Sequence, residues 1–74
     1  LKLITINGPG VLASVSSSIG QAQANIERVE QRESTSDTAE LYFLVGLRNR
    51  TQLARVLTRL RRNPKVFRVS RELG

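Results

Sequence analysis

The amino-acid sequence predicts a single α+β domain whose elements follow in the order β-α-β-β-α-β. Three observations lead to this fold class. Two stretches carry apolar residues at helical spacing, four have the composition or alternation of strands, and turn residues separate them. A chain of 74 residues has room for one hydrophobic core, so we expect one domain over residues 1–74. The sequence begins directly in a strand-like segment, which suggests that it is a piece of a longer protein.

The first predicted strand, Leu1–Ile6, is rich in β-forming residues and ends at a cluster of two glycines and a proline, Asn7-Gly8-Pro9-Gly10. Glycine tolerates positive φ or close approach of another group, and Pro9 fixes its own φ and removes a donor. Two interpretations stay open: a strand-to-helix turn, and a binding loop in which Gly10 permits close approach.

A helix is predicted after Gly10, because one set of apolar residues falls within about 100° of arc at helical spacing. This set is Val11, Leu12, Val15, Ile19 and Ala22. The opposite face carries hydroxyl and amide groups without charge, at Ser14, Ser17, Ser18 and Gln21. An uncharged polar face of this kind can contact a partner.

The middle of the chain predicts a hairpin. Residues Asn25–Glu33 form a polar, partly exposed strand, Ser34–Asp37 a turn, and residues 38–48 a more buried strand. On the third strand, alternation assigns one face to Leu41, Phe43, Val45 and Leu47 and the other to Tyr42 and Leu44.

The second helix has the clearest pattern, an i, i+3, i+4, i+7 stripe made by Leu53, Val56, Leu57 and Leu60. Asn49 or Thr51 can cap its start, and Asn63-Pro64 ends it. Its opposite side carries Arg55, Arg59 and Arg62. A short final strand follows, with Val66, Phe67 and Val69, and with Arg68 and Arg71 pointing outward.

This order is that of the ferredoxin-like βαββαβ sandwich, a four-stranded antiparallel sheet with both helices on one face. Right-handed crossovers place the first and third strands at the centre and the second and fourth at the edges. The other face of the sheet then needs a covering partner or must tolerate water.

Composition narrows the function. The chain has no cysteine, which favours a cytoplasmic origin, and residues 1–74 show neither a signal-peptide pattern nor a stretch apolar enough to be expected to span a membrane. Residues 1–37 contain three basic and four acidic residues, a net charge of −1. Residues 38–74 contain nine basic and two acidic residues, a net charge of +7. The positive charge therefore belongs to the second half.

Catalysis by these residues is not expected. Without His or Cys, and with six scattered acidic residues, the sequence offers no nucleophile–base pair and no acid–base couple. It likewise predicts no metal site and no cofactor.

Nucleic-acid binding is the main alternative. The same topology serves RNA-recognition modules, which stack bases on aromatic residues of the central strands. The first strand here has no aromatic residue, and Tyr42 and Phe43 face opposite sides. Basic side chains can still bind the phosphates of a nucleic acid without recognising its base sequence, so this alternative stays open. The candidates are Arg55, Arg59, Arg62, Arg68 and Arg71, although a simply solvated helix face predicts the same residues.

The loop and the second strand resemble an ACT domain. That family has a strand, a turn of the form Asp-Arg-x-Gly-(Val/Leu)-Leu, a helix, and Asn-Ile at the start of the second strand. Here the turn is Asn7-Gly8-Pro9-Gly10-Val11-Leu12, and Asn25-Ile26 opens the second strand. The resemblance covers the whole chain. It implies a regulatory module that pairs with a second copy and binds small ligands, often amino acids, at these residues, and we expect Asn25-Ile26 to lie beside the loop.

The segment from Leu44 to Arg71 resembles more specifically the ACT domain that closes long RelA/SpoT homologues, the (p)ppGpp synthetase/hydrolases of the GTP pyrophosphokinase family. The matching positions are Arg50, Leu53-Ala54, Leu60-Arg61 and Val66-x-x-Val69-x-Arg71. Asn7-Gly8 stand where the ACT motif often has Asp-Arg, so a neutral amide that donates and accepts replaces a carboxylate.

The resemblance implies a sensor of the stringent response that acts through a homodimer, a branched-chain amino acid ligand and the other domains of a parent enzyme. In some members the implied partner is ribosomal RNA. Two alternatives stay open: an RNA-contacting module that uses the basic second helix, and an ACT domain of an amino-acid biosynthetic enzyme, such as the regulatory subunit of acetolactate synthase.

Overall fold

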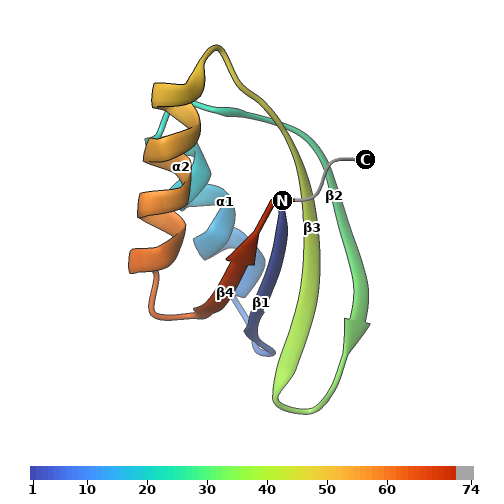
Figure 1. Cartoon of the computed structure of the whole chain (residues 1–74). Helices are drawn as coiled ribbons and strands as arrows, with labels where there is room; N and C mark the ends of the chain where they lie inside the picture. The colour runs from blue at the N-terminus through green and yellow to red at the C-terminus, as the bar shows by residue number, and fades with distance from the viewer. Residues whose placement is uncertain (72–74) are drawn as a thin grey trace.

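The computed structural model describes residues 1–71 and confirms the predicted order of elements. Strands β1 (Lys2–Ile6), β2 (Asn25–Ser34), β3 (Thr38–Gly46) and β4 (Val66–Ser70) form a four-stranded sheet. Helices α1 (Val11–Gln21) and α2 (Arg50–Arg62) lie together against one of its faces (Figure 1). The predicted domain, 1–74, includes residues 72–74, which lie outside the described residues.

The strand order is β2-β3-β1-β4, with every neighbouring pair antiparallel. The first and third strands are therefore central, as the right-handed crossover rule predicts. β2 and β4 form the edges, and both contain irregular pairing. The register shifts in β2 around Glu27 and Arg32, and in β4 at Phe67, so these residues have no paired partner.

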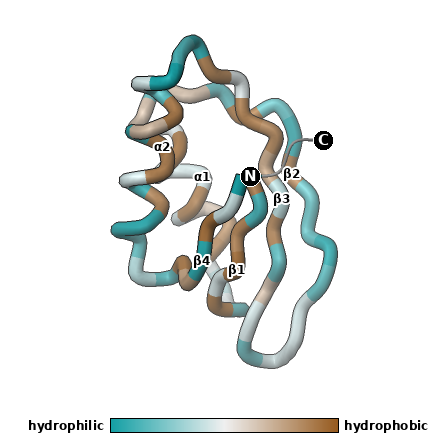
Figure 2. Tube along the Cα trace, viewed as in Figure 1, coloured by the Kyte–Doolittle hydropathy of each residue, from teal (hydrophilic) through white to brown (hydrophobic). Residues whose placement is uncertain are grey.

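The core lies between the sheet and the helices. β1 and β3 alternate regularly, so that Leu3, Leu41 and Phe43 are buried under the helices. Val15 and Ile19 of α1 and Val56 and Leu60 of α2 cover them, and all four are fully buried. Figure 2 shows the same division along the chain, with a largely hydrophilic β2 next to a more hydrophobic β3.

Five large apolar residues of the described chain are exposed outside this core, namely Leu12, Val29, Leu44, Leu47 and Phe67. Leu12, predicted on the buried stripe of the first helix, is 50% exposed, because the buried positions Val11, Val15 and Ile19 already form a narrower stripe. Leu47, predicted on the buried face of the third strand, is 39% exposed because β3 ends at Gly46. Phe67 is 62% exposed at the irregularity in β4. The predicted length of the third strand was therefore wrong at its end.

Asn49 caps α2, and its side chain accepts a 2.9 Å hydrogen bond from the backbone N–H of Gln52. Of the two predicted caps the structure thus selects Asn49 over Thr51. Gln52 itself is buried, accepts from the Arg48 N–H at 2.6 Å and donates to the Gln23 carbonyl at 2.7 Å. This one side chain ties the start of α2 to the link between α1 and β2.

Candidate functional site

The connection between β1 and α1 is exposed, as a binding loop must be. Asn7, Gly8, Pro9 and Gly10 are all exposed to solvent. Val11, the first residue of α1, is only 5% exposed and belongs to the core, whereas the following Leu12 presents an apolar side chain next to the loop. The exposed part of the predicted site is therefore a polar loop with a leucine at its side.

Asn7 fastens this loop to the turn between β2 and β3. Its backbone N–H donates to the Asp37 carbonyl at 2.9 Å, and its side-chain Nδ2 donates to the Thr35 carbonyl at 2.6 Å. Thr35 in turn orders its own turn, because its Oγ1 accepts from the Thr38 N–H at 2.9 Å. The amide of Asn7 keeps its Oδ1 as an acceptor, with no donor to it among residues 1–71.

Gly10 is required here for its backbone conformation. Its φ is +79°, a left-handed conformation that residues with a Cβ disfavour, and it precedes the first turn of α1. Within the chain there is no close approach at this position, since a Cβ on Gly10 would lie 3.9 Å from Lys65 Nζ, an ordinary contact. Close approach of a ligand to Gly10, which the binding-loop interpretation requires, stays a prediction.

Asn25 and Ile26 lie at the other end of the sheet from the loop. Ile6, at the end of β1, pairs with Thr38 at the start of β3, whereas Asn25 pairs with Gly46 at the end of β3. The length of β3 thus separates them. The expectation that Asn25-Ile26 lies beside the loop is wrong within one chain, because the hairpin turns β2 back along β3.

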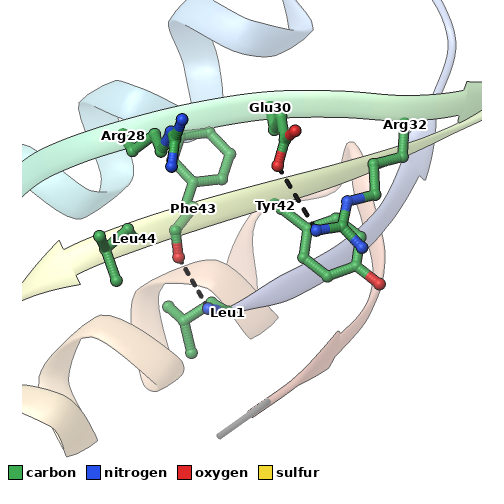
Figure 3. Close-up of a pocket in the computed structure, with 7 residues that line it drawn as sticks. All are labelled: Leu1, Arg28, Glu30, Arg32, Tyr42, Phe43 and Leu44. Atoms are coloured by element: carbon green, nitrogen blue, oxygen red, sulfur yellow. Dashed lines mark hydrogen bonds and ion pairs between the residues drawn. The ribbon is translucent and has the colours of Figure 1, made fainter. Parts of the chain in front are cut away.

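The face of the sheet away from the helices carries linked charges. Lys2 Nζ lies 3.0 Å from Glu40 Oε1, and the Tyr42 hydroxyl donates to the same oxygen at 3.3 Å. The guanidinium of Arg32 lies over the Tyr42 ring, 3.9 Å from its centroid, and 3.5 Å from a Glu30 oxygen. Figure 3 shows Glu30, Arg32 and Tyr42 beside a hollow that Leu1, Arg28, Phe43 and Leu44 also line.

The hydrogen bond from Lys2, assisted by its charge and by the Tyr42 hydroxyl, lowers the pKa of Glu40 below its usual range. Partial desolvation of the carboxyl opposes this shift without reversing it. Glu40 is therefore an anion within the charged surface, and this surface allows the uncovered face of the sheet to contact water.

The helices carry a second candidate site, a basic groove between α1 and α2. Arg55, Arg59 and Arg62 line this groove, and Arg59 Nη1 donates to Gln21 Oε1 of α1 at 2.9 Å. Arg68 lines a different hollow, with Arg61 and Phe67. Arg71 is exposed beyond the end of β4. The structure thus brings together three of the five arginines named as RNA contacts.

Sequence reasoning missed the residues that join separate elements at these sites. Thr35 anchors Asn7, and Asn63 donates from Nδ2 to the hydroxyls of Ser14 and Ser18 at 3.0 and 3.1 Å. These serines, predicted on an outward polar face, are half-buried against the end of α2. Their i, i+4 spacing was visible, but the donor lies 49 residues from Ser14.

Across residues 1–71 the structure holds no group of three or more His, Cys, Asp or Glu side chains that could bind a metal ion. Neither of the described helices is long and apolar enough to cross a membrane.

Comparison with protein families identifies the chain. The family model described as ACT domain matches residues 1–71. A search of curated proteins found no match to the chain. The match spans all six elements, including the β1–α1 loop and the start of β2.

Proposed function

Because the chain belongs to the ACT domain family, a class of small, non-catalytic regulatory domains that bind ligands, we propose that it is the sensor domain of a RelA/SpoT-type enzyme. In this role it adjusts the balance between synthesis and hydrolysis of (p)ppGpp in the stringent response, in the cytoplasm. The observation that carries the ligand-binding part is the exposed loop Asn7–Gly10, which Asn7 fastens to the β2–β3 turn and which the exposed Leu12 borders.

The resemblance of the second half supports the RelA/SpoT assignment. Arg50 is the first residue of α2, and the Leu60-Arg61 pair lies near its end. Val66 and Val69 pack against the core from β4. The arginine-rich α2 argues against the alternative, an ACT domain of an amino-acid biosynthetic enzyme, and the sequence of the parent chain would decide between the two.

We place the dimer contact along β2, the longer of the two edge strands, with 10 residues against 5 in β4. Val29, which pairs with Phe43 near the middle of β2, keeps 40% of its surface exposed. If two copies pair antiparallel with Val29 opposite Val29, then Arg28 of each lies opposite Glu30 of the other. The regular stretch between the two register shifts, Arg28–Gln31, contains all of these positions.

This pairing also resolves the separation of the predicted ligand residues. Antiparallel β2 strands bring the Asn25 end of one copy to the Ser34 end of the other, which adjoins the turn that Asn7 holds through Thr35. The loop of one subunit and Asn25-Ile26 of its partner then border one site. A site shared by two subunits links ligand binding to dimer formation.

The proposed ligand is a branched-chain amino acid. The acceptor Oδ1 of Asn7 suits the ligand's ammonium group, and the exposed Leu12 suits an aliphatic side chain. The neutral amide gives a weaker ammonium contact than the carboxylate found in many ACT motifs. Binding shifts the parent enzyme between conformations only to the extent that the ligand prefers one of them.

Calorimetry with Val, Ile and Leu tests the ligand proposal. We expect saturable binding that Leu12→Ala weakens and Leu44→Ala leaves unchanged, since both leucines are exposed but only Leu12 borders the loop. Absence of heat, and of any shift in melting temperature at millimolar ligand, would contradict amino-acid binding by this domain.

A second candidate, contact with ribosomal RNA, is favoured by the distribution of charge. Neither α1 nor α2 contains an acidic residue, and Arg55, Arg59 and Arg62 line one groove. Such binding should weaken steeply with salt, and Arg→Gln changes at these positions should reduce the slope of affinity against salt. Unchanged RNA affinity in those variants would exclude this role.

A further inference from the structure

The groove between α1 and α2 contains two adjacent hollows, and Gln21, Arg59 and Arg62 line both of them. The hollow nearer the end of α2 is also lined by Lys65, from the link to β4, and by Ser14 of α1. Arg55 lines the other hollow. Four cations from two segments of the chain, α2 and the link to β4, thus surround one short groove.

The position of Arg59 is fixed across the groove by the hydrogen bond from Nη1 to Gln21 Oε1, 2.9 Å long. A guanidinium has five N–H donors, so this contact leaves most of them available. Arg59 is therefore held in place for a further acceptor before any ligand binds.

Ser14 adds an oriented neutral donor. Asn63 is 8% exposed, and its Nδ2 donates to Ser14 Oγ at 3.0 Å and to Ser18 Oγ at 3.1 Å. The Ser18 hydroxyl donates a hydrogen bond to the backbone carbonyl of Ser14, at 3.2 Å. The Ser14 hydroxyl has no acceptor among the described residues and lines the hollow, so its hydrogen is available to a ligand.

Among residues 1–71, no carboxylate forms an ion pair in this groove. The described acidic residues lie on β2, on β3 and in the turn between them, at Glu27, Glu30, Glu33, Asp37 and Glu40. No ion pair between a helix arginine and any of them is present in the described part of the chain. The cations of the groove are therefore not neutralised by the described part of the chain, which suits an anionic ligand.

We propose that the groove binds a small phosphate anion with two or more linked phosphoryl groups. Arginine and hydroxyl donors match the several acceptor oxygens of a phosphoryl group. Two adjoining hollows with Arg59 and Arg62 between them suit two linked groups better than one. Arg55, Arg59 and Arg62 lie within about two turns of α2, over a length of about 10 Å, which favours a compact ligand over a long nucleic-acid backbone. This site uses neither Asn7 nor the β2 edge, and so it is independent of the amino-acid proposal.

Titration of the chain with sodium pyrophosphate, at an ionic strength held constant with sodium chloride, tests this site by calorimetry. We expect saturable binding with one pyrophosphate per chain, and weaker binding of orthophosphate. Arg59→Gln or Arg62→Gln should each weaken binding about tenfold, as expected for loss of one charge-assisted hydrogen bond. Ser14→Ala should weaken it by a smaller factor.

Arg61→Gln is the matched control, because it removes the same charge from the same helix but lines the hollow beside Phe67 and Arg68. It should change the affinity less than about twofold, the effect of net charge alone on an exposed site. Equal losses in Arg61→Gln and Arg59→Gln would overturn the proposal, as would the absence of saturation. A short RNA that binds while pyrophosphate does not would overturn it in favour of nucleic acid.

Discussion

At the scale of single residues, Asn63 does more than end α2. Its side chain donates to Ser14 and Ser18, and its Oδ1 accepts from the Lys65 N–H at 2.9 Å. Asn63→Ala should therefore lower the free energy of unfolding by about 1 to 3 kcal/mol, since three half-buried partners lose their hydrogen bonds. Urea denaturation measures this loss, with the exposed Asn25→Ala as control. Equal effects of the two changes would contradict the role given to Asn63.

Glu40 gives the fold a dependence on acid pH. Its pKa in the folded state is lowered by the hydrogen bond and charge of Lys2, so the ionised carboxylate stabilises the folded form. This contribution is complete above the unfolded-state pKa and is lost as pH falls through the lowered folded-state value. We expect Glu40→Gln to flatten the acid side of a plot of melting temperature against pH. An unchanged profile in the variant would show that other carboxyl groups dominate.

At the scale of elements, the β1–α1 connection depends on one of its two glycines. Gly10 has φ +79°, whereas Gly8 has no positive φ and a Cβ there would meet nothing within 4 Å. Gly10→Ala should therefore destabilise the domain by about 1 kcal/mol, the usual cost of a left-handed residue with a Cβ, and Gly8→Ala should not. Thermal unfolding of both variants checks this. Equal losses would mean that the loop needs both glycines for another reason.

The elements also show what the sequence could predict. Alternation in β1 and β3 and the stripe of α2 reflect local geometry, so the strand order and most of the core followed from them. The narrower stripe of α1, which leaves Leu12 exposed, depends on where α2 packs. The contact of Asn7 with Thr35 spans 28 residues, and that of Asn63 with Ser14 spans 49. No local periodicity encodes such pairs. For this reason the sequence did not predict the hydrogen bonds that join separate elements at both candidate sites.

At the scale of the whole molecule, charge is segregated between the two layers. The helices carry only basic charges, and the described acidic residues lie on β2, β3 and their turn. The free edge of β2 therefore carries side chains of both charges, which can form ion pairs with a second copy. Basic helices of two copies would repel if they met, which favours contact through the edge of the sheet over contact through the helices.

The proposed dimer register predicts which reversals of charge on β2 weaken the dimer and which restore it. Arg28→Glu would place a carboxylate opposite the partner's Glu30, and the twofold axis through Val29 repeats this contact. Two like-charge pairs cost about 1 to 2 kcal/mol in total, so the dissociation constant should rise about tenfold. The double variant Arg28→Glu/Glu30→Arg exchanges the two signs and should restore dimerisation. Sedimentation velocity over a concentration series measures both constants. A wild-type chain that stays monomeric, or a double variant as weak as the single one, would contradict pairing centred on Val29.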